Sequence, residues 1–143
     1  MIGLIVTGHG NFASGLTSSL KLIEGNNLNN YEFVDFEVTD SVEVLEEKLN
    51  KAFDSLKDCD GILVLCDLIG GSPFKSATII GGKNDNVEIV AGTNLPMLIE
   101  VNMLRQFQSD LKSLTDQAIE AGKSMISKYV YEAYVEEEPD EGI

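Results

Sequence analysis

The chain has 143 residues, of which 43% are apolar and 24% charged, a composition typical of a single globular domain. Its formal net charge of −14 would repel the phosphates of nucleic acids and of anionic lipid surfaces, so neither is expected as a partner. It has neither a basic, apolar signal peptide nor the ~20 consecutive apolar residues of a membrane span, so no direct membrane insertion is expected.

Apolar runs rich in β-branched residues alternate along the chain with segments whose apolar residues recur every three or four positions. The runs predict strands, and the periodic segments predict amphipathic helices. Asp40 or Ser41 can cap the second of these helices. In chain order the expected elements are a strand at 2–6, a helix at about 12–23, a strand at 31–36, a helix at about 45–56, a strand at 62–66, a helix at 73–80, a strand at 87–91 and helices at 95–107 and 111–125.

The two cysteines, Cys59 and Cys66, lie before and inside one apolar run. In that setting each is expected to be a small buried hydrophobe with a free thiol. Free thiols suit a reducing compartment, so a cytoplasmic location is expected.

Strands that alternate with helices form βαβ units, which build a parallel sheet covered by helices on both faces. We therefore predict an α/β fold with a doubly wound, mostly parallel sheet of strand order 2-1-3-4. Residues 129–135 also have the composition of a strand, and the domain is expected to span residues 1–135. Residues 136–143 are expected to form an acidic C-terminal tail.

His9 is the only histidine of the chain and follows the first predicted strand, between Gly8 and Gly10. The flanking glycines keep bulk away, so that a partner molecule can approach the ring closely. Because imidazole changes its charge near neutral pH more easily than other side chains, His9 is the best candidate for chemistry. A solvated loop residue is the alternative interpretation.

Asp67 follows the third predicted strand as His9 follows the first. In a sheet of order 2-1-3-4 both residues border one crevice at the carboxyl ends of the strands, where doubly wound folds bind ligands. A carboxylate that accepts the proton of one ring nitrogen leaves the other nitrogen free as a nucleophile and stabilises the cation formed on attack. At ~4 Å and an effective dielectric constant of about 20 this attraction is about 4 kcal/mol before desolvation. A simple turn residue is the alternative interpretation of Asp67.

The segment Gly70-Gly71-Ser72-Pro73 is typical of a helix start, with Ser72 as the N-cap and Pro73 at the first helical position. The free N–H groups and the positive dipole end of such a start bind phosphate. The segment therefore predicts an anion site to which Ser72 adds a hydroxyl, although a simple capped turn has the same sequence. Together with the histidine and the carboxylate it favours phosphoryl transfer at a histidine.

Other chemistries fit the sequence less well. One histidine, two separated cysteines and scattered acids offer no metal-ligand spacing, so no metal is expected. The chain has no Walker A lysine motif and no G-x-G-x-x-G turn, so no nucleotide cofactor is expected either. A hydrolase could combine the histidine and Asp67 with Ser72 or Cys66, but the G-x-S-x-G elbow is missing.

Three motifs at the predicted strand ends resemble those of the IIA components of the mannose family of the bacterial phosphoenolpyruvate-dependent sugar phosphotransferase system. The resemblance covers almost the whole chain, and three motifs in order make it specific. The motifs are Ile5-Val6-Thr7-Gly8-His9-Gly10, Leu65-Cys66-Asp67 with Gly70-Gly71-Ser72-Pro73-Phe74, and Ala91-Gly92-Thr93-Asn94-Leu95-Pro96-Met97-Leu98.

This resemblance implies a phosphotransferase that acts through a phosphohistidine. His9 would receive a phosphoryl group from the phosphocarrier HPr and pass it to a IIB component, which phosphorylates the sugar during transport through the membrane components IIC and IID. Asp67 would orient and stabilise the imidazole. The other expected site residues are Gly70, Gly71 and Ser72 around the phosphate, and Gly8, Gly10, Leu68 and Asn94 along the pocket.

Members of this family are similar in forming homodimers whose fifth, antiparallel strand crosses to the other subunit, and residues 129–135 match that strand. The alternative is a strand that closes the sheet edge of its own chain. Relatives often continue into a IIB domain, so the chain is expected to be a separate IIA subunit or a fragment that ends at the linker. Two functional alternatives are a IIA-like subunit that serves dihydroxyacetone kinase and a regulatory module that binds a phosphorylated ligand without catalysis.

Overall fold

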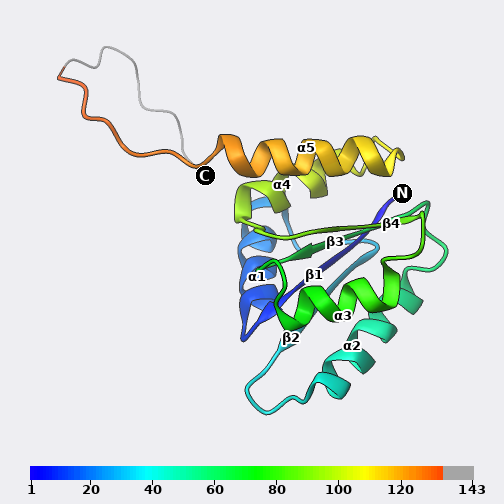
Figure 1. Cartoon of the computed structure of the whole chain (residues 1–143). Coiled ribbons are helices and arrows are strands. Elements are labelled where there is room, and N and C mark those ends of the chain that lie inside the picture. The colour runs from blue at the N-terminus through cyan, green and yellow to red at the C-terminus, as the bar shows by residue number, and fades with distance from the viewer. Residues whose placement is uncertain (134–143) are drawn as a thin grey trace.

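A four-stranded sheet forms the centre of the chain, whose residues 1–133 are described by the computed structural model (Figure 1). The strands lie in the order β2-β1-β3-β4, and every neighbouring pair is parallel. The predicted α/β fold and strand order are therefore confirmed. The strands are β1 (Gly3–His9), β2 (Tyr31–Phe36), β3 (Ile62–Cys66) and β4 (Val87–Val90).

Helices cover both faces of this sheet, and they are α1 (Phe12–Glu24), α2 (Val42–Ser55), α3 (Ser72–Gly81), α4 (Leu95–Leu104) and α5 (Leu111–Ser124). α1, α4 and α5 pack on one face against Leu4 and Val6 of β1, whereas α2 and α3 pack on the other face against Ile5 (Figure 1). Successive side chains of a strand point to opposite faces, so the continuous apolar run of β1 serves both cores. No helix within residues 1–133 combines the length and the apolar character that a bilayer crossing requires.

The first strand is longer than its apolar run predicts. β1 extends to His9, because Gly8 and His9 pair with Asp35 and Phe36 of β2. This pairing uses backbone groups and needs no apolar side chain. His9 is therefore the last residue of a strand rather than a residue of the following loop.

Two predicted helix starts can be compared with the structure. Ser41, not Asp40, caps α2, since the Ser41 hydroxyl accepts the N–H of Val44 at 3.2 Å. The prediction of Ser72 as the N-cap of α3 is wrong. Gly71 takes that position with an extended backbone (φ −70°, ψ 166°), and its carbonyl closes the first turn with the N–H of Lys75. Ser72 is thus the first residue of the helix.

Arg105, the only arginine of the chain, follows α4 and is buried near the amino ends of β1 and β2. Its guanidinium donates to the carbonyls of Ile2 at 3.0 Å, Asn29 at 2.6 Å and Asn30 at 3.0 Å. Its Nε donates to Asn102 Oδ1 at 3.0 Å. Burial lowers the pKa of Arg105, and these oxygens take the place of water around its charge. One side chain therefore ties the end of α4 to the start of the sheet.

Residues 126–133 follow α5 and extend away from the rest of the chain (Figure 1). Tyr129, Val130 and Tyr131 are 83%, 65% and 75% exposed, and residues 129–133 form no strand in this chain. Positions 134 and 135 of the predicted fifth strand and the predicted tail at 136–143 lie outside the described residues. Among residues 1–133, no strand lies beside the outer edge of β4. Residues 129–133 therefore do not close the sheet edge of their own chain.

Candidate active site

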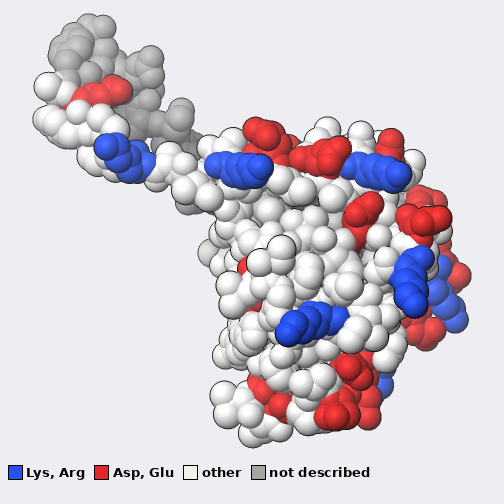
Figure 2. Space-filling view, viewed as in Figure 1, with Lys and Arg blue, Asp and Glu red and all other residues white. Residues whose placement is uncertain are grey.

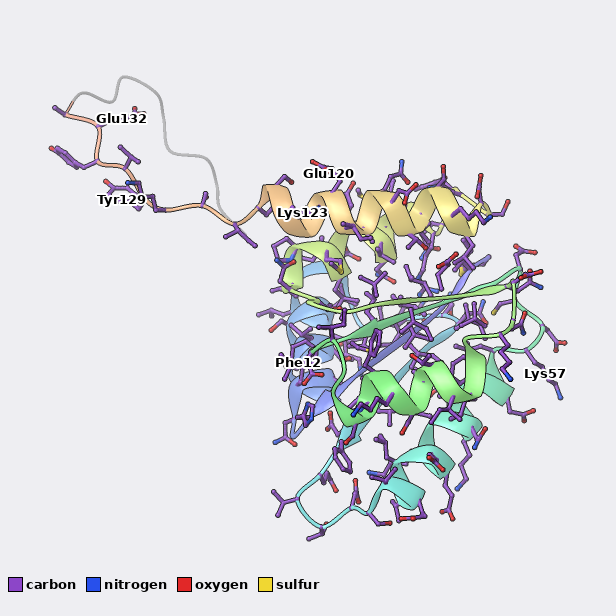
Figure 3. The ribbon with its side chains drawn as sticks, in the orientation of Figure 1. Phe12, Lys57, Glu120, Lys123, Tyr129 and Glu132 are labelled. Carbon is purple, nitrogen blue, oxygen red and sulfur yellow. The ribbon has the colours of Figure 1, made fainter. Side chains whose placement is uncertain are left out.

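The loops that follow β1, β3 and β4 lie at the carboxyl edge of the sheet, where α1 and α3 begin (Figure 1). The loops after β3 and β4 are joined by two hydrogen bonds, from Gly92 N to the Asp67 carbonyl and from Thr93 N to the Cys66 carbonyl. Figure 3 labels Phe12, the first residue of α1, at this edge. Segments that are far apart in the sequence thus converge on one place.

The Asp67 carboxylate contacts both the backbone N–H and the ring of His9. Asp67 Oδ2 lies 2.7 Å from His9 Nδ1 and accepts the His9 backbone N–H at 2.8 Å, while Oδ1 accepts the N–H of Leu68 at 2.8 Å. Burial raises the pKa of the Asp67 carboxyl, but the hydrogen bonds from His9 and Leu68 outweigh it and hold that pKa below its ordinary value. An ionised carboxylate only accepts hydrogen bonds, so a neutral imidazole carries its proton on Nδ1. Nε2 is thereby left with a free lone pair.

Gly71 packs against the His9 ring. A Cβ atom at Gly71 would lie 2.8 Å from His9 Cε1 and 3.5 Å from Nε2, so only glycine allows this approach. In the first turn of α3, the N–H groups of Ser72 and Phe74 have no acceptor among residues 1–133. Together with the positive end of the helix dipole, free N–H groups of this kind can bind an anion.

Gly8 and Gly10 shape the backbone on either side of His9. A Cβ atom at Gly8 would lie 2.5 Å from Phe12 Cδ1 and 2.9 Å from Asp67 Cγ, so glycine lets the phenyl ring and the carboxylate close in on β1. Gly10 has a φ of 58° and turns the chain toward α1. Gly8 therefore allows tight packing beside the histidine, and Gly10 allows the turn that follows it.

The surface around His9 carries few charges. The His9 side chain is 44% exposed, and Leu68 and Ile69 of the loop after β3 are 60% and 81% exposed. In Figure 2 the charged side chains gather over α5 and on the right of the molecule, whereas the left side, where the strands end, is mostly uncharged. Exposed apolar side chains of this kind are typical of surfaces that bind other molecules.

The structure gives Asn94 a capping role and confirms the expected burial of Cys66. Asn94 caps α4, where its side chain accepts the N–H of Met97 at 3.1 Å and donates to the Gly122 carbonyl at 3.0 Å. Its amide thus joins α4 to α5, and its place along the pocket stays a prediction. Cys66 is fully buried, and burial raises the pKa of its thiol to about 12, which argues against a cysteine hydrolase.

Phe36 is a neighbour of His9 that the sequence did not reveal. The two rings lie 6.0 Å apart between centroids, at an angle of 61°. The sequence signal for this contact is the register of β1 and β2, which pairs His9 with Phe36 and which composition alone does not give.

Comparison with known proteins gives the family of the chain. Residues 3–119 match the family EIIA-man, described as PTS system fructose IIA component. The chain is 30% identical over 134 residues to the PTS system fructose-specific EIIA component of Bacillus subtilis (strain 168), a match that covers 90% of this chain and 91% of that protein. It is 33% identical over 122 residues to the PTS system mannose-specific EIIAB component of Escherichia coli (strain K12), covering 85% of this chain but only 38% of that longer protein.

A solved structure shows the same relationship. The crystal structure of phosphotransferase system component EIIA from Streptococcus agalactiae is similar with a TM-score of 0.81 and 30% identity, over 90% of this chain and 97% of that one. The family match spans β1 to α5 and so includes both His9 and Asp67. The chain therefore belongs to the mannose family of IIA components and takes part in phosphoryl transfer in the sugar phosphotransferase system.

Proposed function

We propose that His9 carries the phosphoryl group. Its Nε2 attacks the phosphorus of phosphorylated HPr, so that a new N–P bond forms as the bond between phosphorus and the phosphocarrier breaks. His9 then donates the group to a IIB component, which phosphorylates the sugar as it enters through the membrane components IIC and IID. The 2.7 Å contact between Nδ1 and Asp67 carries this proposal, because a neutral ring that donates its Nδ1 proton to the carboxylate keeps the lone pair of Nε2 free.

The groups around Nε2 suit the charges that develop during this transfer. Attack leaves a positive charge on the imidazole, which the Asp67 carboxylate stabilises. The N–H groups of Ser72 and Phe74, the Ser72 hydroxyl and the helix dipole, equivalent to about half a positive charge, face the phosphoryl oxygens. Gly70 and Gly71 keep side chains away from the oxygens. No step requires a cofactor.

The direct test is the intact mass of the chain after incubation with phosphoenolpyruvate, enzyme I and HPr. The proposal requires one acid-labile phosphoryl adduct, located in the peptide that contains His9. If HPr is charged and the chain carries no adduct, a regulatory module that binds a phosphorylated ligand through the anion site becomes the better account. If the adduct forms but passes to a dihydroxyacetone kinase subunit and not to a IIB component, the acceptor in the proposal is wrong.

Asp67→Asn should slow phosphoryl acceptance about a hundredfold. The amide cannot stabilise the imidazolium, and its N–H group can donate to Nδ1, which would place the ring proton on Nε2. The measurement is a quenched time course of adduct formation at a fixed concentration of phosphorylated HPr. Asp54→Asn is the matched control, because the Asp54 side chain is 77% exposed. Unchanged kinetics in Asp67→Asn would remove Asp67 from the mechanism.

The same carboxylate makes stability depend on pH. The pKa of Asp67 is lower in the folded chain than its ordinary value of about 3.9, so its stabilising contribution is fully present above that ordinary value. The contribution is lost as the pH falls through the lower, folded value. The difference in unfolding free energy between the wild type and Asp67→Asn is therefore expected to be constant near neutral pH and to shrink in acid.

We also propose that the chain acts as a homodimer in which residues 129–135 pair antiparallel with β4 of a second copy. This arrangement is supported by the exposure of Tyr129, Val130 and Tyr131 and by the outer edge of β4, which no strand among residues 1–133 covers. Sedimentation should find a dimer, and the double change Tyr129→Ser and Tyr131→Ser should weaken association at least about tenfold. Phe107→Ser, at an 87% exposed position, is the control. A monomeric wild type at tens of micromolar would contradict the proposal.

The remaining proposals concern the bounds of the domain and the cellular location of the reaction. We propose that residues 1–135 form the IIA domain and that residues 136–143 form an acidic tail. We place the reaction in the cytoplasm, because the free thiols of Cys59 and Cys66 suit a reducing compartment.

A further inference from the structure

Phe36, the last residue of β2, lies beside His9 at the end of the sheet. The register of β1 and β2 pairs the two residues, and the N–H of Gly10 donates to the Phe36 carbonyl at 2.8 Å. The rings meet edge-on, 6.0 Å apart between centroids and inclined by 61°. Backbone pairing therefore fixes where the phenyl ring stands relative to the imidazole.

The imidazole has contacts on both sides of its own strand. Nδ1 is hydrogen-bonded to Asp67, and Cε1 lies against Gly71, both in the loop after β3. Phe36 approaches from β2, which flanks β1 on the side opposite to β3. The ring is thus bracketed between the two neighbouring strands, while part of its surface stays open to solvent.

Phe36 is also anchored in a hydrophobic core. It is partly buried and packs against the core that β1, β3, α2 and α3 share, near the buried Val34 of its own strand. Close packing of this kind holds side chains near rotamer minima. The phenyl ring can therefore restrain a neighbour, as a freely moving surface side chain could not.

We propose that Phe36 is a positioning residue for phosphoryl transfer, an inference that rests on the proposed role of His9. The hydrogen bond at Nδ1 and the approach of Gly71 restrain the imidazole from the side of β3 alone. Phe36 restrains it from the side of β2, so that Nε2 stays beside the start of α3. Since a displacement of ~1 Å in a reacting group can cost about a hundredfold in rate, a partial loss of this restraint should be measurable.

The test compares three variants in the transfer reaction with phosphorylated HPr. Phe36→Leu keeps an apolar side chain but removes the ring edge, and it should lower the rate at saturating HPr about tenfold, with an unchanged half-saturating concentration. Phe36→Tyr keeps the ring and should restore the wild-type rate. Phe33→Leu is the matched control: Phe33 is on the same strand and 45% exposed, but pairs with Val6, and the change should have no effect.

A spectroscopic measurement separates positioning from a role in packing alone. His9 is the only histidine of the chain, so its ring signals in nuclear magnetic resonance spectra are unambiguous. Phe36→Leu should broaden these signals or shift them toward a mobile ring, and Phe33→Leu should leave them unchanged. A purely structural role would lower the melting temperature of Phe36→Leu and leave the ring signals as in the wild type. Phe36→Met serves as a second ringless variant if Phe36→Leu does not fold.

The outcomes separate this inference from the proposed function. A wild type that accepts no phosphoryl group from charged HPr refutes the role of His9 itself. If the wild type reacts and Phe36→Leu reaches the same maximal rate, the positioning role is wrong and the function stands. A raised half-saturating concentration at an unchanged maximal rate also overturns it, because Phe36 would then belong to the surface that docks HPr.

Discussion

His9→Ala should abolish phosphoryl acceptance and leave the fold intact. The chain has no second histidine to take over, and the nearby Cys66 thiol is fully buried with a raised pKa. The fold should survive, because the His9 side chain is 44% exposed and belongs to neither hydrophobic core. The measurements are intact mass after incubation with phosphoenolpyruvate, enzyme I and HPr, and the melting temperature of the same preparation.

Ser72→Ala is the matched control for this variant. Ser72 lies at the start of α3 and takes no part in the hydrogen bond between His9 and Asp67. Ser72→Ala should therefore still form the adduct, with a rate reduced by the loss of one hydroxyl contact. An adduct on His9→Ala would contradict the central role of the histidine, and an adduct absent only from Ser72→Ala would move that role to the serine.

Arg105→Met should lower the free energy of unfolding by about 3 kcal/mol. The change leaves the carbonyls of Ile2 and Asn29 and the side-chain oxygen of Asn102 without the donor they now have. Each buried acceptor without a partner costs about 1–3 kcal/mol, the part-buried carbonyl of Asn29 costs less, and the sum is partly offset because a cation no longer has to be buried. The carbonyl of Asn30 keeps a second donor, the N–H of Leu4, and adds little.

Urea unfolding of the wild type, Arg105→Met and Lys57→Met measures this effect. Lys57, labelled in Figure 3, has a 66% exposed side chain and only a surface contact of 3.8 Å with Asp54, so its change should stay within about 0.5 kcal/mol. Phosphoryl acceptance by folded Arg105→Met should be normal, because Arg105 binds the amino end of β1 and His9 is at the carboxyl end. Equal stability of the two variants would show that the guanidinium contributes nothing net.

The strand order and the meeting of His9 with Asp67 could be predicted from the sequence. Alternating strands and helices allow few topologies, because parallel strands need right-handed crossover connections. Once β1 and β3 are neighbours, residues at their carboxyl ends must lie side by side. Local sequence patterns therefore suffice to predict a contact that follows directly from the strand order.

The contacts of single side chains could not be predicted in this way. Arg105 stood out only as the one arginine, and its acceptors Asn29 and Ile2 are 76 and 103 positions away. Gly71 and Ser72 are both acceptable N-caps, and the packing of Gly71 against His9 favours the earlier helix start. In each case the deciding contact comes from a distant part of the chain.

His9 ends β1 and Asp67 directly follows β3, and these two strands lie in the middle of the sheet. Both strands are almost wholly buried and have a hydrogen-bonded neighbour on each side. Amide hydrogens in such strands exchange with solvent only through openings that approach global unfolding, whereas helix ends and sheet edges open locally at much lower free energy. The reactive pair is thus attached to the slowest-exchanging part of the domain, so thermal fraying of the periphery leaves its geometry in place until the whole domain unfolds.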